Sequence, residues 1–115
     1  MILIVGGAYQ GKTAYVRENF GEGYCVINSY QLRVKEQLRA GENPMEEAHR
    51  LVAEKRAEGV WNRLVIISDE TGCGVVPMDA FERLCREQSG RVSCYLAEEA
   101  DSVIRVICGI GKKIK

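Results

Sequence analysis

Residues 6 to 13 read Gly-Gly-Ala-Tyr-Gln-Gly-Lys-Thr and fit the phosphate-binding loop pattern G-x-x-x-x-G-K-[ST]. The preceding run, Met1 to Val5, consists of aliphatic and β-branched side chains, which predicts a short buried strand. The following run, Thr13 to Phe20, mixes apolar and polar side chains and predicts a short helix. A strand, a glycine-rich turn and a helix in this order are what such a loop requires, so the N-terminal part of the chain is restricted to a βα unit.

The residue types in this segment suit the chemistry of a phosphate chain. Glycine lets the backbone N–H groups approach phosphate oxygens closely, and the N-terminus of the next helix adds a partial positive charge. In this pattern the lysine reaches the β- and γ-phosphates and the hydroxyl binds Mg²⁺. The alternative is a glycine-rich turn that only happens to precede Lys-Thr. We predict a nucleoside triphosphate site in which Lys12 is catalytic, Thr13 holds the metal, and the binding residues are Gly6, Gly7, Ala8, Tyr9, Gln10, Gly11, Lys12 and Thr13.

The composition restricts the partners of the chain. Its 115 residues suit one nucleotide-binding domain, residues 1–115, and the formal net charge of zero gives no basic excess for nucleic acid. No apolar run approaches the length of a membrane span, and the first strand ends after five residues, unlike a signal peptide. The five cysteines include no C-x-x-C pair, which fits a reducing compartment; Cys73, in a glycine-rich segment, is the one we single out. We therefore expect a cytoplasmic protein without nucleic-acid or membrane partners.

Apolar runs alternate with helical patterns along the rest of the chain. This alternation predicts an α/β domain with a mostly parallel sheet and flanking helices. One helix should begin at Pro44 with Asn43 as its cap, and another should run from Asp79 to Cys94 with an interruption at Gly90. A short helix is possible from Gln31 to Arg39. The expected strands after the first are Tyr24–Ile27, Leu64–Ser68 and Val103–Cys108, followed by an edge strand or tail from Gly109 to Lys115.

Two acidic residues follow the Leu64–Ser68 strand. In a parallel sheet, functional residues gather at the carboxyl ends of the strands, where the glycine-rich loop also begins. Carboxylates there can hold a metal or position an attacking hydroxyl. We predict catalytic roles for Asp69 and Glu70, with Glu70 also a ligand to Mg²⁺. The alternative is that these acids merely mark the end of a strand.

The segments Asp69–Pro77, Gly90–Val92 and Cys108–Lys115 give a more specific indication. Together they resemble the bifunctional cobinamide kinase/cobinamide-phosphate guanylyltransferase family of cobalamin biosynthesis, whose members carry Asn-Glu-Val-Gly-x-Gly-Ile-Val-Pro and then Gly-Arg-Val-Asn-Gln. The resemblance covers roughly residues 1–16 and 64–115. It implies a fold like that of P-loop NTPases, ATP or GTP with Mg²⁺, a cobinamide as acceptor and a homo-oligomer. It therefore also implies a transferase of the kinase type.

The chain departs from this family in its middle. Family members are longer between the second strand and Leu64, where they carry a histidine that takes GMP covalently and a further strand that ends in aspartate. The one histidine here, His49, lies in Met45–Ala57, which predicts an ordinary amphipathic helix with His49 in solvent. Asp69 replaces the family asparagine, so the acid could have been relocated, and Ser93-Cys94 replaces the family Asn-Gln.

Three functions remain open from the sequence. The first is transfer of a γ-phosphoryl group from ATP or GTP to a cobinamide-type hydroxyl, with Arg91 either supporting developing charge or forming a helix salt bridge. The second is a reduced nucleotide-binding module without catalysis. The third is a small P-loop kinase with another substrate, against which the matches at Gly72–Pro77 and Gly90–Asp101 argue.

Overall fold

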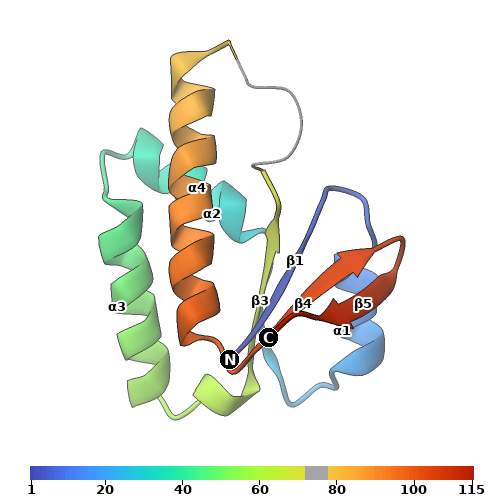
Figure 1. Ribbon diagram of the computed structural model, residues 1–115. Coiled ribbons are helices and arrows are strands. Elements are labelled where there is room, and N and C mark those ends of the chain that lie inside the picture. Colours follow the sequence, from blue (N-terminus) through green and yellow to red (C-terminus); the bar gives the residue numbers. More distant parts are fainter. Residues whose placement is uncertain (72–77) are drawn as a thin grey trace.

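A computed structural model describes residues 1–71 and 78–115. It is an α/β fold whose elements alternate as the sequence predicts (Figure 1). None of the described helices has the length and apolar character needed to cross a membrane. In chain order the elements are β1 (Ile2–Gly6), α1 (Lys12–Asn19), β2 (Cys25–Ile27), α2 (Tyr30–Arg39), α3 (Pro44–Ala57), the 3₁₀ turn η1 (Trp61–Arg63), β3 (Leu64–Asp69), α4 (Ala80–Glu99), β4 (Ser102–Ile107) and β5 (Ile110–Lys113).

The described strands form one sheet in the order β2-β3-β1-β4-β5. The first four strands are parallel, and β5 pairs with β4 in the antiparallel direction. β1 therefore lies at the centre, and its last residue, Gly6, is in register with Asp69 at the end of β3. This pairing brings the start of the glycine-rich loop beside the first of the two predicted acids.

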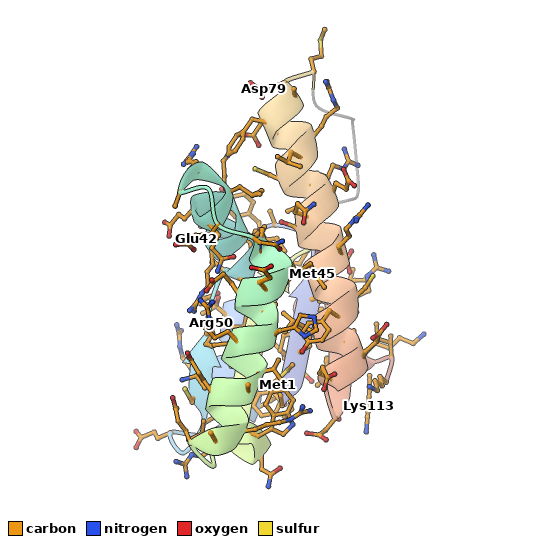
Figure 2. All side chains as sticks on the ribbon, turned by 90° about the vertical axis from the view of Figure 1, so that its left-hand side faces the viewer. Met1, Glu42, Met45, Arg50, Asp79 and Lys113 are labelled. Carbon is orange, nitrogen blue, oxygen red and sulfur yellow. The ribbon has the colours of Figure 1, made fainter. Side chains whose placement is uncertain are left out.

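The larger hydrophobic core lies between one face of the sheet and helices α2, α3 and α4. Figure 2 shows α3 and α4 side by side over that face, with Arg50 on the outer side of α3. The opposite face carries a smaller core, to which the described helices contribute Val16 from α1. The buried members of the larger core include Leu3, Leu64, Ile66 and Val103 from the strands and Tyr30, Val34, Ala48, Leu51, Val52, Val92 and Leu96 from the helices.

The predicted start of α3 is confirmed. The side chain of Asn43 accepts hydrogen bonds from the backbone N–H groups of Met45 and Glu46, and Pro44 is the first helical residue. Asp79 caps α4 in the same way, by accepting from Phe81 N–H and Glu82 N–H. These caps satisfy backbone donors that have no partner within the helix.

The prediction that Gly90 interrupts the last helix is wrong, because α4 continues from Ala80 to Glu99. A single glycine weakens a helix by only about 1 kcal/mol relative to alanine, and packing of Val92 and Leu96 in the core outweighs that cost. At the end of the chain, the alternative of an edge strand is confirmed by β5. Cys73 lies outside the described residues, and the described cysteines are unpaired.

We expect Gly90→Ala to raise the free energy of unfolding by about 0.8–1 kcal/mol. A β-carbon at Gly90 would meet no atom within 4 Å, and the helix is regular there. Gly59→Ala is the matched control, because its site is equally open but has φ +75°. Alanine in that conformation should cost about 1–2 kcal/mol. Urea denaturation measures both, and destabilisation by Gly90→Ala would contradict the packing described here.

Candidate functional site

The glycine-rich loop joins β1 to α1 at the carboxyl edge of the sheet. Two of its residues have left-handed backbone conformations, Gly11 with φ 85° and Tyr9 with φ 59°. At the start of the loop, the Gly6 carbonyl accepts a hydrogen bond of 2.8 Å from the Glu70 N–H. A β-carbon at Gly6 would lie 2.4 Å from the backbone oxygen of Val106, so a glycine is required where β1 passes β4.

Lys12 is the one charged residue of the loop, and it is buried, with 7% of its surface exposed. Its Nζ donates a hydrogen bond of 2.6 Å to the Gly7 carbonyl and lies 2.7 Å from Oδ1 of Asp69. The ammonium group is therefore held over the loop by one carbonyl and one carboxylate. A buried cation of this kind needs such partners, because burial without them would be costly.

Asp69 reaches this position because it ends β3 opposite Gly6. Its backbone N–H donates a 3.0 Å hydrogen bond to Oε1 of Gln31 on α2, which fixes the end of the strand. We expected the strand Leu64–Ser68 to place an acidic residue beside the glycine-rich loop, and Asp69, at the end of β3, occupies that place.

Thr13 faces a residue that the sequence reasoning did not single out. Nδ2 of Asn28 lies 3.4 Å from Oγ1 of Thr13 and donates to it. Asn28 and Ser29 follow β2 directly, and polar residues immediately after a parallel strand are the signal that could have identified them. The threonine hydroxyl is therefore oriented by a neighbouring amide.

A cavity of about 320 Å³, which we name the loop cavity, opens over these groups. Hard oxygen donors border it, and Mg²⁺ is commonly held by one or two such side chains together with phosphate oxygens. Thr13 and Asp69 fit that requirement. No group of three or more metal-binding side chains occurs in residues 1–71 and 78–115. The described lining residues are Tyr9, Gln10, Gly11, Lys12, Thr13, Ala14, Asn28, Ser29 and Asp69.

Glu70 does not border the loop cavity in the described part of the chain. Its carboxylate accepts two hydrogen bonds from Arg105 on β4, 2.9 Å from Nε and 3.0 Å from Nη2. Successive residues of a strand point to opposite faces, which explains why the two adjacent acids diverge. The metal-binding and catalytic roles of Glu70 stay predictions. In the structure the Glu70 carboxylate is bound to Arg105, whereas the Asp69 carboxylate lies beside Lys12.

Gln10 fastens the loop to the turn between β4 and β5. Its Oε1 accepts a 2.8 Å hydrogen bond from Cys108 N–H, and its carbonyl accepts one of 2.8 Å from Gly109 N–H. The turn also packs closely, because a β-carbon on Gly11 would lie 3.3 Å from Cα of Gly109. Gln10 therefore supports the loop from outside, a contact that the sequence pattern does not reveal.

Two further predicted candidates lie elsewhere. His49 is exposed on α3, with its ring 4.1 Å from that of Tyr95, and it is not among the described residues that line the loop cavity. This agrees with a solvated helix histidine. Arg91 forms an exposed i,i+4 salt bridge of 2.8 Å with Glu87, which agrees with the structural alternative for that residue.

A mostly parallel sheet, a glycine-rich loop after its central strand, and a lysine–aspartate pair at the carboxyl edge define a P-loop-like α/β protein. The model of the family described as cobinamide kinase/cobinamide phosphate guanyltransferase matches residues 17–114, which is most of the chain. The chain therefore belongs to this family. The matched residues begin within α1, after the glycine-rich loop.

Two curated relatives carry the name bifunctional adenosylcobalamin biosynthesis protein CobU. The protein from Salmonella typhimurium strain LT2 is 43% identical over 53 residues, and that from Escherichia coli strain K12 is 42% identical over 53 residues. In each case the match covers 46% of this chain and 29% of the relative. The matched part is thus well under half of each relative's length.

Gly6→Ala should lower the free energy of unfolding by about 1–3 kcal/mol, because the new methyl group would collide with the Val106 carbonyl. Gly7→Ala is the control. There a β-carbon would have its nearest contact 3.7 Å away, at Cγ of Gln10, so its effect should be clearly smaller. Urea denaturation of both variants tests this difference. Equal losses of stability would mean that β1 and β4 can separate without cost.

Proposed function

We propose that this chain binds ATP or GTP with Mg²⁺ through residues Gly6 to Thr13 and transfers the γ-phosphoryl group to a cobinamide-type hydroxyl. Family membership supports the substrate class, since the family is described as a cobinamide kinase and guanyltransferase. The observation that carries the proposal is the Lys12–Asp69 pair of 2.7 Å, which borders the loop cavity. In this pair a cation that can bind phosphate lies next to a carboxylate that can bind a metal ion or accept the proton of a hydroxyl group.

Each side chain then has a distinct task. Lys12 exchanges its contacts with Gly7 and Asp69 for phosphate oxygens, to which an ammonium group forms strong charge-assisted hydrogen bonds. Asp69, once released, is positioned to hold Mg²⁺ or accept the proton of the acceptor hydroxyl, and Thr13 offers its hydroxyl beside Asn28. When bound, Mg²⁺ neutralises charge on the phosphates. Glu70 keeps its proposed roles as a catalytic residue and a ligand to Mg²⁺. It starts from a position in which its carboxylate is bound to Arg105.

The exposed position of His49 favours phosphoryl transfer over a covalent guanylyl route through that histidine. We propose further that the protein acts as a homo-oligomer, because one chain offers few walls for an acceptor as large as a cobinamide. The alternative is a module that binds nucleotide without turnover. Nucleotide binding without phosphoryl transfer to cobinamide would identify the chain as such a module.

Lys12→Ala should weaken Mg²⁺–nucleotide binding by about 10- to 100-fold, the loss expected from charge-assisted hydrogen bonds of about 1.5–3 kcal/mol. Arg17→Ala is the control, since Arg17 is an exposed cation on the same helix. Isothermal titration with ATP and with GTP, with and without Mg²⁺, measures the affinities, and a thermal melt confirms that both variants fold. Unchanged affinity in Lys12→Ala would refute the nucleotide assignment.

Asp69→Asn should lower the rate of phosphoryl transfer to cobinamide by about 10²- to 10⁴-fold, the usual contribution of a positioned acid or base. Nucleotide affinity should change much less, because the amide keeps the shape of the side chain. Glu70→Gln is the comparison, and we expect a smaller loss because its carboxylate is directed toward Arg105. Labelled triphosphate with product separation gives the rates. A larger loss in Glu70→Gln would reverse the assignment of roles.

A further inference from the structure

The hairpin of β4 and β5 lies with its turn beside the loop that joins β1 to α1 (Figure 1). The turn consists of Cys108 and Gly109, with φ 51° and φ 77°, between the paired residues Ile107 and Ile110. Two consecutive left-handed residues in a two-residue hairpin loop are typical of a type I′ turn. The bond that closes such a turn joins the flanking residues, so the N–H groups of Cys108 and Gly109 need acceptors elsewhere.

Gln10 supplies both acceptors. Its Oε1 accepts from the Cys108 N–H and its backbone carbonyl accepts from the Gly109 N–H, each at 2.8 Å. One residue of the glycine-rich loop is therefore joined to the hairpin turn by a side-chain bond and by a backbone bond. Only the first of these depends on the side chain, so a substitution can remove it separately.

The backbone bond fixes the orientation of a peptide group. A trans peptide group carries its C=O and its N–H in opposite directions. Because the Gln10 carbonyl is turned toward Gly109, the N–H of Gly11 in the same peptide group points away from the hairpin. Gly11 borders the loop cavity, whereas Gly109 is not among the described residues that line it. The hairpin thus directs the Gly11 N–H toward the side on which phosphate would bind.

The residues on either side of Gln10 do not favour this orientation by themselves. Gly11 has φ 85°, and glycine adopts positive and negative φ about equally readily, so rotation of the peptide group costs little there. Tyr9 has φ 59°, an uncommon conformation for a large side chain, and that side chain is entirely exposed. Packing of Tyr9 therefore does not stabilise its backbone, and the contacts of Gln10 take on that task.

The hairpin also contacts the helix that follows the loop. A β-carbon at Gly111 of β5 would overlap the ring of Tyr15 on α1, so this ring lies directly against the β5 backbone. The Tyr15 N–H in turn donates a 2.9 Å hydrogen bond to the Gly11 carbonyl. Both β5 and α1 thus keep contacts of their own when the Gln10 side chain is changed.

We infer that Gln10 is a positioning residue: by binding Cys108 and Gly109 it holds the Gly11 N–H toward the bound triphosphate. This inference rests on the proposed function. A rotated peptide group would present a carbonyl oxygen to the phosphate oxygens, and two acceptors repel each other. Nucleotide then binds only those molecules in which the peptide group is correctly oriented, and the apparent Kd rises as their fraction falls.

The test removes the side-chain bond and keeps the bulk of the side chain. Gln10→Met should raise the Kd for Mg²⁺–ATP and Mg²⁺–GTP, measured by isothermal titration, by about 2- to 10-fold, the range that corresponds to one intramolecular hydrogen bond. Gln10→Ala is a second variant with the same expected result. Asn19→Ala is the matched control, because its amide donates a 2.8 Å bond to a backbone carbonyl of α1 outside the loop. That variant should leave both Kd values unchanged.

A second measurement needs no nucleotide. Rotation of a peptide group between two orientations on the microsecond-to-millisecond timescale appears as ¹⁵N relaxation dispersion. The Gly11 amide should give a flat profile in the unchanged chain and in Asn19→Ala, and an exchange contribution in Gln10→Met. A residue that only stabilises the fold would lower the free energy of unfolding and leave this profile flat.

The two measurements together decide the question. Weaker nucleotide binding with new exchange at Gly11 supports the positioning role of Gln10, and either change without the other overturns it. Unchanged affinity and a flat profile in the folded variants also overturn it, while nucleotide binding by the unchanged chain keeps the proposed function standing. If the unchanged chain binds neither nucleotide, the proposed function fails, and the positioning role that rests on it fails as well.

Discussion

The parallel pairing of β1 with β3 is the contact on which the site depends. Its register sets Gly6 opposite Asp69, so that the loop leaving β1 and the acid ending β3 meet at one edge of the sheet. Leu3, Ile4, Ile66 and Ile67 are almost fully buried in these two strands. A shift of one residue would turn each of these side chains toward the other face, and the two faces are covered by different cores, with Leu3 and Ile66 in the larger and Ile4 and Ile67 in the smaller, so their packing opposes the shift. The positions of Lys12 and Asp69 follow from that register.

The elements of the fold could be predicted largely from local signals. Short apolar runs gave the strands, and Asn43 with Pro44 gave the start of α3, because a cap acts through its neighbours along the chain. The interruption at Gly90 was predicted from the same local reasoning and was wrong. There the outcome depended on core contacts of Val92 and Leu96, which no local pattern contains.

The candidate site was predictable only in part. The loop pattern identified Lys12 and the strand end identified Asp69, but the two consecutive acids were treated alike. Side-chain alternation along a strand separates them, and the partner of Glu70, Arg105, lies 35 positions away in the sequence. The contacts of Asn28 with Thr13 and of Gln10 with the β4–β5 turn likewise join distant segments. Such contacts follow from the sheet order, which the sequence left open.

The link between Gln10 and Cys108 has a consequence for the order of assembly. These residues are 98 positions apart, and Met1 is joined to Asp101 over 100 positions. Contacts between distant segments close late, because the intervening chain must first be ordered. During synthesis the loop residues emerge from the ribosome first. Cys108 and Gly109, whose N–H groups bind Gln10 of the loop, emerge about 98 residues later. The loop can therefore adopt its supported shape only after β4 and β5 are in place, and a shortened nascent chain that lacks them would carry the motif without the site.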